Sequence, residues 1–274
     1  KLIFFGTSDF SRPVFEALKK EGYSPILWKL NNSLDDFKKM KPDICVVAAY
    51  GKIIPKDWLR IPKYGFLNIH PSLLPKYRGP SPMQAAILNG EKETGVTIIL
   101  MDEKIDHGPI LAKSKIQMTN GKKYKELEKE LAELGAKLLI EILPRWIRGE
   151  LKPTEQNHEA ATFTKKFSWP DGKIDWLKSA DEIDRQIRAL NPEPGTWTKW
   201  NDKILKIFRA LPVSVKNDNL ISGRVFMTES KETVIKCGFN TALLVEMVQL
   251  ECKKPMEIKD FLNGHKNFIN SILN

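Results

Sequence analysis

Two polar side chains, Asn68 and His70, have the types and the spacing of a catalytic pair. They lie two residues apart, so on a β-strand both side chains project from the same face. An asparagine amide can donate to a developing oxyanion, and a histidine can accept or give a proton near neutral pH. The pair suits acyl transfer to an amine, while a structural, hydrogen-bonded histidine at a strand end remains the alternative.

A second polar cluster, Asp102, Asp106 and His107, falls on an expected loop between two strands. An aspartate from this loop could orient His70 and hold it as the imidazolium, which would complete a catalytic trio. Acidic loop residues usually face solvent, so the cluster alone does not decide between the two roles.

Other common site chemistries lack their sequence patterns. The turn Gly6-Thr7-Ser8 is not the Gly-x-Gly-x-x-Gly of dinucleotide-binding loops, and no Walker-type loop occurs. No Gly-x-Ser-x-Gly segment indicates a covalent acyl-enzyme. The four histidines are scattered without a His-x-x-x-His pair, so we expect no metal.

Several residues near these segments are ambiguous in the sequence. Arg78 either holds its loop through a buried carboxylate or meets the substrate. His107 is expected to be an exposed turn residue, and His158 has no evident partner. Packing rather than base stacking is expected of the tryptophans Trp169, Trp176, Trp197 and Trp200. Two roles fit the basic residues of the C-terminal part equally well: contact with phosphate groups or simple exposure to solvent. These residues are Lys203, Lys206, Arg209 and Arg224.

The elements that must position the candidate pair alternate between strand and helix patterns. This alternation is typical of an α/β fold with a Rossmann-like, doubly wound, mostly parallel sheet. Asn68 and His70 would then lie at the carboxyl end of a strand, where open α/β sheets bind ligands. Strands are predicted at 2–5, 24–28, 43–49, 66–70, 96–101 and 110–117, and helices at 12–20, 33–40, 83–88 and 122–148.

The sequence predicts three parts along the chain. Residues 1–150 would form the catalytic domain, and the proline-punctuated stretch 151–200, with a helix at 180–190, a linker or junction. Residues 201–274 would form a small C-terminal β-barrel of OB-like type. Its strands are predicted at 204–208, 220–226, 233–237 and 242–250, with a closing helix at 257–262.

The charge favours a polyanionic partner but does not require one. The 274 residues carry 44 Lys and Arg against 34 Asp and Glu, a formal charge of +10. Residues 1–150 hold 25 basic and 18 acidic side chains, 151–200 hold 8 of each, and 201–274 hold 11 and 8. The excess is therefore spread over both ends, without a disordered basic tail.

Cysteine content and hydropathy limit the cellular compartments in which the protein is expected. Cys45, Cys237 and Cys252 are few and odd in number, which fits free thiols in a reducing compartment. The longest apolar run, Ile44–Tyr50, is far shorter than the roughly 20 residues of a membrane span. No leader pattern precedes the first strand, so we expect a cytoplasmic protein without membrane contact. We also expect a monomer.

Two segments together resemble the signature of the folate-dependent formyltransferases. They read Asn-Ile-His-Pro-Ser-Leu-Leu-Pro from Asn68 and Asp-Glu-Lys-Ile-Asp-His-Gly-Pro from Asp102. The resemblance implies that Asn68, His70 and Asp106 are catalytic, with 10-formyltetrahydrofolate as co-substrate and no metal. The folate-binding positions that it implies are Gly51, Lys52, Ile53, Ile54, Ser72, Leu73, Leu74, Pro75, Asp102, Glu103, Lys104 and Ile105.

Within this family the rest of the chain resembles the methionyl-tRNA formyltransferases. The similarity covers the opening at 1–7, the Ile-Arg-Ala-Leu-Asn-Pro-x-Pro-Gly segment at 187–195 and the C-terminal Lys-Lys-Pro-Met at 253–256. It implies formyl transfer to the α-amine of methionyl initiator tRNA for translation initiation. The C-terminal barrel would then be a tRNA-binding domain.

Two departures from that pattern keep a second function open. The short segment Lys29–Pro42 stands where family members usually carry a longer basic insertion, and Glu193 stands where an aromatic residue is common. Nucleotide-sugar N-formyltransferases share the trio and also lack the insertion. They are the alternative to a tRNA substrate.

Overall fold

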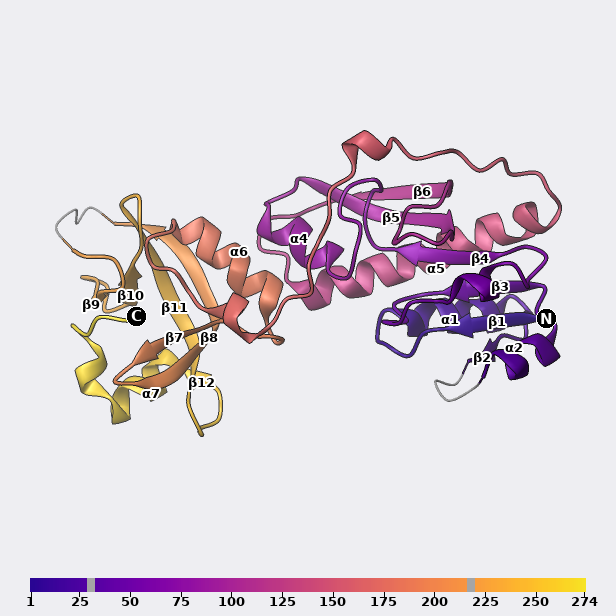
Figure 1. Cartoon of the computed structure of the whole chain (residues 1–274). Coiled ribbons are helices and arrows are strands. Elements are labelled where there is room, and N and C mark those ends of the chain that lie inside the picture. The colour runs from indigo at the N-terminus through magenta and orange to yellow at the C-terminus, as the bar shows by residue number, and fades with distance from the viewer. Residues whose placement is uncertain (29–32, 216–219) are drawn as a thin grey trace. The chain divides into compact units, whose positions relative to one another are not determined.

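The computed structural model describes residues 1–28, 33–215 and 220–274, which form two compact units (Figure 1). The N-terminal unit contains residues 1–86 and 91–166, and the C-terminal unit contains residues 87–90 and 167–274. Residues 151–200, expected to form a linker, therefore contribute to both units. The functional roles assigned to 1–150, 151–200 and 201–274 stay predictions.

A six-stranded sheet forms the centre of the N-terminal unit, in the order β2-β1-β3-β4-β5-β6. The first four strands of this order pair in parallel, and β5 and β6 add antiparallel pairs at one edge. The Rossmann-like, mostly parallel α/β sheet is thus confirmed. The strands are β1 (Leu2–Phe5), β2 (Ile26–Leu27), β3 (Ile44–Val47), β4 (Phe66–His70), β5 (Glu93–Leu100) and β6 (Ile110–Gln117).

The helices of this half lie close to their predicted ranges, apart from the short α3, which the sequence did not indicate. The helices are α1 (Ser11–Lys20), α2 (Leu34–Met40), α3 (Lys56–Leu59), α4 (Pro82–Leu88) and α5 (Tyr124–Ile147). Helix α2 begins with a reciprocal capping box between Ser33 and Asp36. Because its carboxylate accepts hydrogen bonds from Ser33, the pKa of Asp36 is lowered.

Strand β4, which carries the candidate pair, is packed tightly on both sides. Helix α5 crosses it so closely that a Cβ on Gly135 would lie 2.7 Å from Ile69 Cγ2. An aromatic cluster packs around Phe66, and within it Phe37 and Trp58 stack with ring centroids 4.7 Å apart. Asn68 and His70 therefore project from a backbone with little freedom to shift.

The C-terminal unit is built on an antiparallel sheet in the order β7-β8-β11-β10-β9, with β12 paired to β11. This confirms the strand-rich C-terminal module. Strand β7 was not predicted, because the prolines before it indicated a linker. The elements are α6 (Ala180–Leu190), β7 (Trp197–Trp200), β8 (Lys203–Ser214), β9 (Val225–Met227), β10 (Thr233–Lys236), β11 (Thr241–Leu250), β12 (Met256–Glu257) and α7 (Ile258–Gly264).

Helix α6 covers the C-terminal sheet through Ile183 and Ile187. Trp176, Trp197 and Trp200 are buried, as expected for packing residues, whereas Trp169 is partly exposed and stacks on Trp197. All three cysteines are free. Among the described residues, no helix is long and apolar enough to span a bilayer.

Candidate active site

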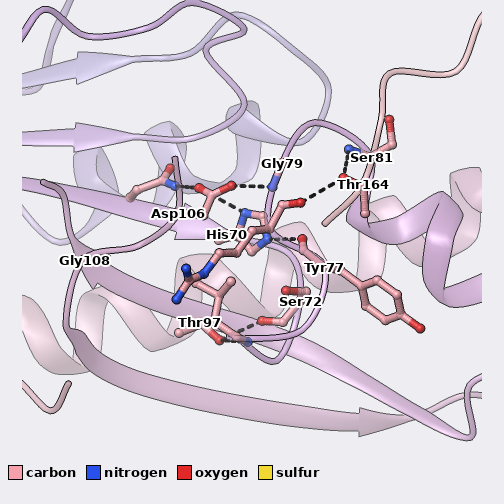
Figure 2. A network of polar contacts seen from close by, with 12 residues as sticks. His70, Ser72, Tyr77, Gly79, Ser81, Thr97, Asp106, Gly108 and Thr164 are labelled. Atoms are coloured by element: carbon pink, nitrogen blue, oxygen red, sulfur yellow. Dashed lines mark hydrogen bonds and ion pairs between the residues drawn. The ribbon is translucent and has the colours of Figure 1, made fainter. Parts of the chain in front are cut away.

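The three residues of the expected trio meet at the end of β4. Figure 2 shows His70 and Asp106 side by side there. Strand β4 supplies Asn68 and His70, and the loop between β5 and β6 supplies Asp106. Asn68 Nδ2 donates to Asp106 Oδ1 at 3.1 Å, and His70 Nδ1 lies 3.4 Å from the same oxygen. The sequence placed Asn68 and His70 on one face, and the fold adds the carboxylate between them.

The orientation of the His70 ring follows from its second nitrogen. His70 Nε2 lies 2.9 Å from the backbone carbonyl oxygen of Tyr77. A carbonyl oxygen only accepts hydrogen bonds, so Nε2 carries a proton. The neutral ring consequently presents a lone pair at Nδ1 towards Asp106, and the charged ring presents an N–H. Nδ1 is therefore the nitrogen that can exchange a proton at this site.

Both carboxylate oxygens of Asp106 are held. Oδ1 accepts from Asn68, and Oδ2 accepts from the backbone N–H of Gly79 at 2.8 Å. Gly79 has a φ of +107°, a backbone conformation that favours glycine. The loop after β4 thus turns back far enough to fix the acid that comes from the β5–β6 loop.

The Ser72–Pro75 loop, predicted to bind folate, is anchored by Thr97 on β5. Thr97 Oγ1 donates to the Ser72 carbonyl at 2.7 Å and accepts from Leu74 N–H at 3.1 Å. Lys113 on β6 adds a hydrogen bond from Nζ to the Leu74 carbonyl. Burial lowers the pKa of Lys113. This loop is therefore attached to the sheet at two consecutive strands.

Replacing Thr97 with valine is expected to destabilise the fold by about 1–3 kcal/mol, because the buried Leu74 N–H loses its acceptor. Urea unfolding monitored by circular dichroism measures the change. Thr94→Val is the matched control on the same strand: Thr94 is buried, and its hydroxyl makes no hydrogen bond within residues 1–28, 33–215 and 220–274. Equal destabilisation of the two variants would contradict the anchoring role.

The remaining predicted folate-binding residues lie on two loops. Gly51–Ile54 follow β3, the parallel neighbour of β4, so they share the carboxyl edge of the sheet with the trio. Asp102–Ile105 precede Asp106 on the β5–β6 loop. Two apolar side chains on these loops, Ile53 and Ile105, are 80% and 61% exposed. Hydrogen bonds and ion pairs between 51–54 and the trio are absent from the described part of the chain.

Arg78, Gln156, His107 and His158 form a network beside Asp106 that the sequence did not reveal. Arg78 is 3% exposed and contacts no carboxylate among the described residues; its Nε and Nη2 donate to Gln156 Oε1, and Nη2 also contacts His158 Nδ1 at 2.8 Å. The predictions for both histidines were wrong. His107 Nδ1 lies 2.5 Å from Asp102 Oδ2, and its ring stacks on His158 with centroids 4.0 Å apart.

The pKa of His158 is lowered, first by loss of hydration and then by charge repulsion from His107 and Arg78. Arg78 Nη2 donates to Nδ1 of this ring, which fits a neutral His158. The described residues contain no group of three His, Cys, Asp or Glu side chains that could hold a metal ion.

Comparison with protein families matches both halves of the chain. Residues 6–143 match the formyl transferase family, and residues 166–266 match the formyl transferase C-terminal domain. A methionyl-tRNA formyltransferase from Dictyoglomus turgidum is 37% identical, covering 97% of this chain and 96% of the relative. One from Chloroflexus aurantiacus is 41% identical, covering 84% and 74%.

Solved structures show the same fold at lower identity. HypX from Aquifex aeolicus, in complex with tetrahydrofolic acid, superposes with a TM-score of 0.75 at 21% identity, covering 98% of this chain and 48% of HypX. An N-formyltransferase from Helicobacter canadensis, in complex with folinic acid and dTDP-3-aminofucose, gives 0.70 at 20% identity, covering 89% and 98%. By its two matched domains and its similarity to relatives along nearly their whole length, the chain belongs to the formyl transferase family, with the methionyl-tRNA formyltransferases as its relatives.

Proposed function

We propose that this protein transfers a formyl group from 10-formyltetrahydrofolate to the α-amine of methionyl initiator tRNA. The observation that carries the proposal is the arrangement of Asn68, His70 and Asp106 at the end of β4. Full-length similarity to methionyl-tRNA formyltransferases supports the choice of acceptor. The proposed location is the cytoplasm and the proposed state is a monomer.

The proposed reaction uses each member of the trio in a different way. The neutral amine of the acceptor attacks the formyl carbon; a C–N bond forms to the amine, and the bond from the formyl carbon to N10 breaks. The second N–H of Asn68 Nδ2 would stabilise the oxyanion. The Nδ1–H of a charged His70, which faces Asp106 Oδ1 at 3.4 Å, would be shared between this carboxylate and the oxyanion. Asp106 would hold the charged ring and help the proton that leaves the amine to reach N10.

Three loops would bind the folate donor. Ser72–Pro75, anchored by Thr97, offers a fixed backbone, and Gly51–Ile54 and Asp102–Ile105 flank the same edge. The exposed Ile53 and Ile105 suit the flat aromatic parts of a folate, because ligand pockets combine apolar walls with a few placed polar groups. When bound, the donor supplies the activated formyl group.

The tRNA would bind basic side chains of both parts, with residues 201–274 as the tRNA-binding domain. Lys206 Nζ lies 5.1 Å from the Trp169 ring centroid, and Arg209 is held by Glu246 and Glu257. Arg209 is thus already paired with two carboxylates. The short Lys29–Pro42 segment lies partly outside the described residues, because 29–32 are not described.

A nucleotide-sugar N-formyltransferase is the second candidate. The shortness of residues 29–42 favours it, because such a chain lacks the long basic insertion expected for tRNA binding. The proposed trio would serve a sugar amine equally well, so the chemistry alone does not separate the two acceptors.

Formyl transfer from 10-formyltetrahydrofolate to methionyl initiator tRNA, compared with transfer to a dTDP-amino-sugar, tests the proposal. We expect transfer to the tRNA. Between 50 and 200 mM salt, kcat/KM for the tRNA should fall by more than about tenfold, because dissolved ions weaken several lysine and arginine contacts to phosphate. The kcat/KM for a sugar nucleotide should respond only weakly. Transfer to the amino-sugar alone would contradict the tRNA assignment.

A further inference from the structure

We infer that Gln156 is a positioning residue for Asp106, and that formyl transfer depends on it through this carboxylate. The inference rests on the proposed function. Gln156 follows β6 and α5 in the chain, 50 residues after Asp106, and makes no hydrogen bond to Asn68 or His70 in the described part of the chain. Its role is therefore to place another residue and not to touch the reacting atoms.

The carboxamide of Gln156 binds the backbone on both sides of His107. Its Nε2 donates to the Asp106 carbonyl at 2.9 Å and to the Gly108 carbonyl at 2.7 Å. A side-chain amide has two N–H groups, and both are used here. Gln156 is 5% exposed, so little water competes for these hydrogen bonds.

The other end of the carboxamide is fixed by a buried cation. Gln156 Oε1 accepts from Arg78 Nε at 3.2 Å and from Nη2 at 2.7 Å. The guanidinium can only donate, so the oxygen must face Arg78 and the nitrogen must face the two carbonyls. A glutamate here would bind Arg78 more strongly but would repel both carbonyls. Only an amide meets both requirements.

The Asp106 loop needs such a support because its backbone conformation is unusual. Asp106 has a φ of +47°, a region that costs energy for a residue with a side chain. The nearby Gly108 lies so close to the chain that a Cβ there would be 1.9 Å from the Leu100 carbonyl oxygen. Holding the two carbonyls keeps the Asp106 carboxylate within reach of Asn68, His70 and Gly79.

Two variants of Gln156 distinguish its two roles, which are to position Asp106 and to accept hydrogen bonds from Arg78. Gln156→Glu keeps an acceptor for Arg78 and loses both donors; Gln156→Ala loses both functions. In each variant we expect kcat to fall about 10- to 100-fold, with the KM for 10-formyltetrahydrofolate changed less than about threefold, since a misplacement of about 1 Å is this costly. Asn157→Ala, which removes only a local cap on Glu159 N–H, is the control at wild-type kcat.

Wild-type kcat in Gln156→Glu with a low kcat in Gln156→Ala would overturn the inference, because Gln156 would then serve Arg78 alone. A second measurement needs no substrate. Gly79 N–H donates to Asp106 Oδ2, so amide hydrogen exchange at Gly79, measured by mass spectrometry, should be about tenfold faster in Gln156→Glu than in the wild type. Unchanged exchange would overturn the inference even if the wild-type chain formylated no acceptor, whereas an inactive wild type with faster exchange would contradict only the proposed function.

Discussion

Replacing Asp106 with asparagine is expected to lower kcat for formyl transfer on the order of 10³-fold while the fold is retained. Both carboxylate oxygens accept hydrogen bonds, one from Asn68 Nδ2 and one from Gly79 N–H. An asparagine has one acceptor oxygen, so its NH₂ group must face a donor on one side. The charged form of His70 would also lose its counter-charge, which the proposed proton transfer requires. Initial rates at saturating donor and acceptor measure the effect.

The control for Asp106→Asn is Asp57→Asn on α3, which removes an exposed carboxylate and should leave kcat within about twofold, as is usual for surface substitutions. Far-UV circular dichroism and urea unfolding should show a folded Asp106→Asn protein, destabilised by about 1–3 kcal/mol through the unsatisfied donor. A kcat within tenfold of wild type would contradict the proposed role of Asp106.

Replacing His70 with alanine is expected to lower kcat by about 10²- to 10⁴-fold, the range of general acid–base catalysis. The ring is buried, and its Nε2–H is fixed by the Tyr77 carbonyl, so no other described side chain presents a titratable nitrogen to Asp106 Oδ1. Steady-state rates with methionyl initiator tRNA and, separately, a dTDP-amino-sugar measure the effect on either candidate reaction.

The His70→Ala variant also offers a chemical test of cause. It leaves a space of the size of an imidazole ring, so added imidazole should restore part of the rate, whereas added acetate should not. Retained binding of 5-formyltetrahydrofolate, measured by calorimetry, shows that the donor site has survived. Near-wild-type turnover of the variant without imidazole would rule out His70 as the acid or base.

Local pattern was enough to predict most of the strands and helices. The alternation from Phe66 to His70 placed Asn68 and His70 on one face, and the capping signal at Ser33 located the start of α2. The antiparallel pairing of β4 with β5 was not predicted, because hydrophobic alternation determines the type of an element and not its neighbours. Strand β7 was missed since Pro192 and Pro194 dominate the local composition.

The candidate site was likewise only partly predictable from the sequence. Resemblance to a family singled out Asp106, whereas the sequence alone left it as one acidic loop residue among several. The hydrogen bonds between Arg78 and Gln156, which support the Asp106 loop, were not predicted. The two residues are 78 positions apart, and neither belongs to a periodic pattern. A buried arginine paired with neutral side chains has no short-range signal in sequence, since only the folded chain brings its partners within reach.

The junction of β4 and β5 has a consequence for how catalytic competence is acquired. The β5–β6 hairpin, with Asp106 in its loop, is local in sequence, whereas the parallel pairs of β1, β3 and β4 require crossover connections. The register that pairs Asn68 with Ile99 and His70 with Thr97 is what joins these two parts. A folding intermediate with both parts formed but this one register missing would hold every site residue in native local structure and catalyse nothing. Recovery of turnover during refolding would therefore report the joining of these two parts, and not the formation of the bulk of the secondary structure.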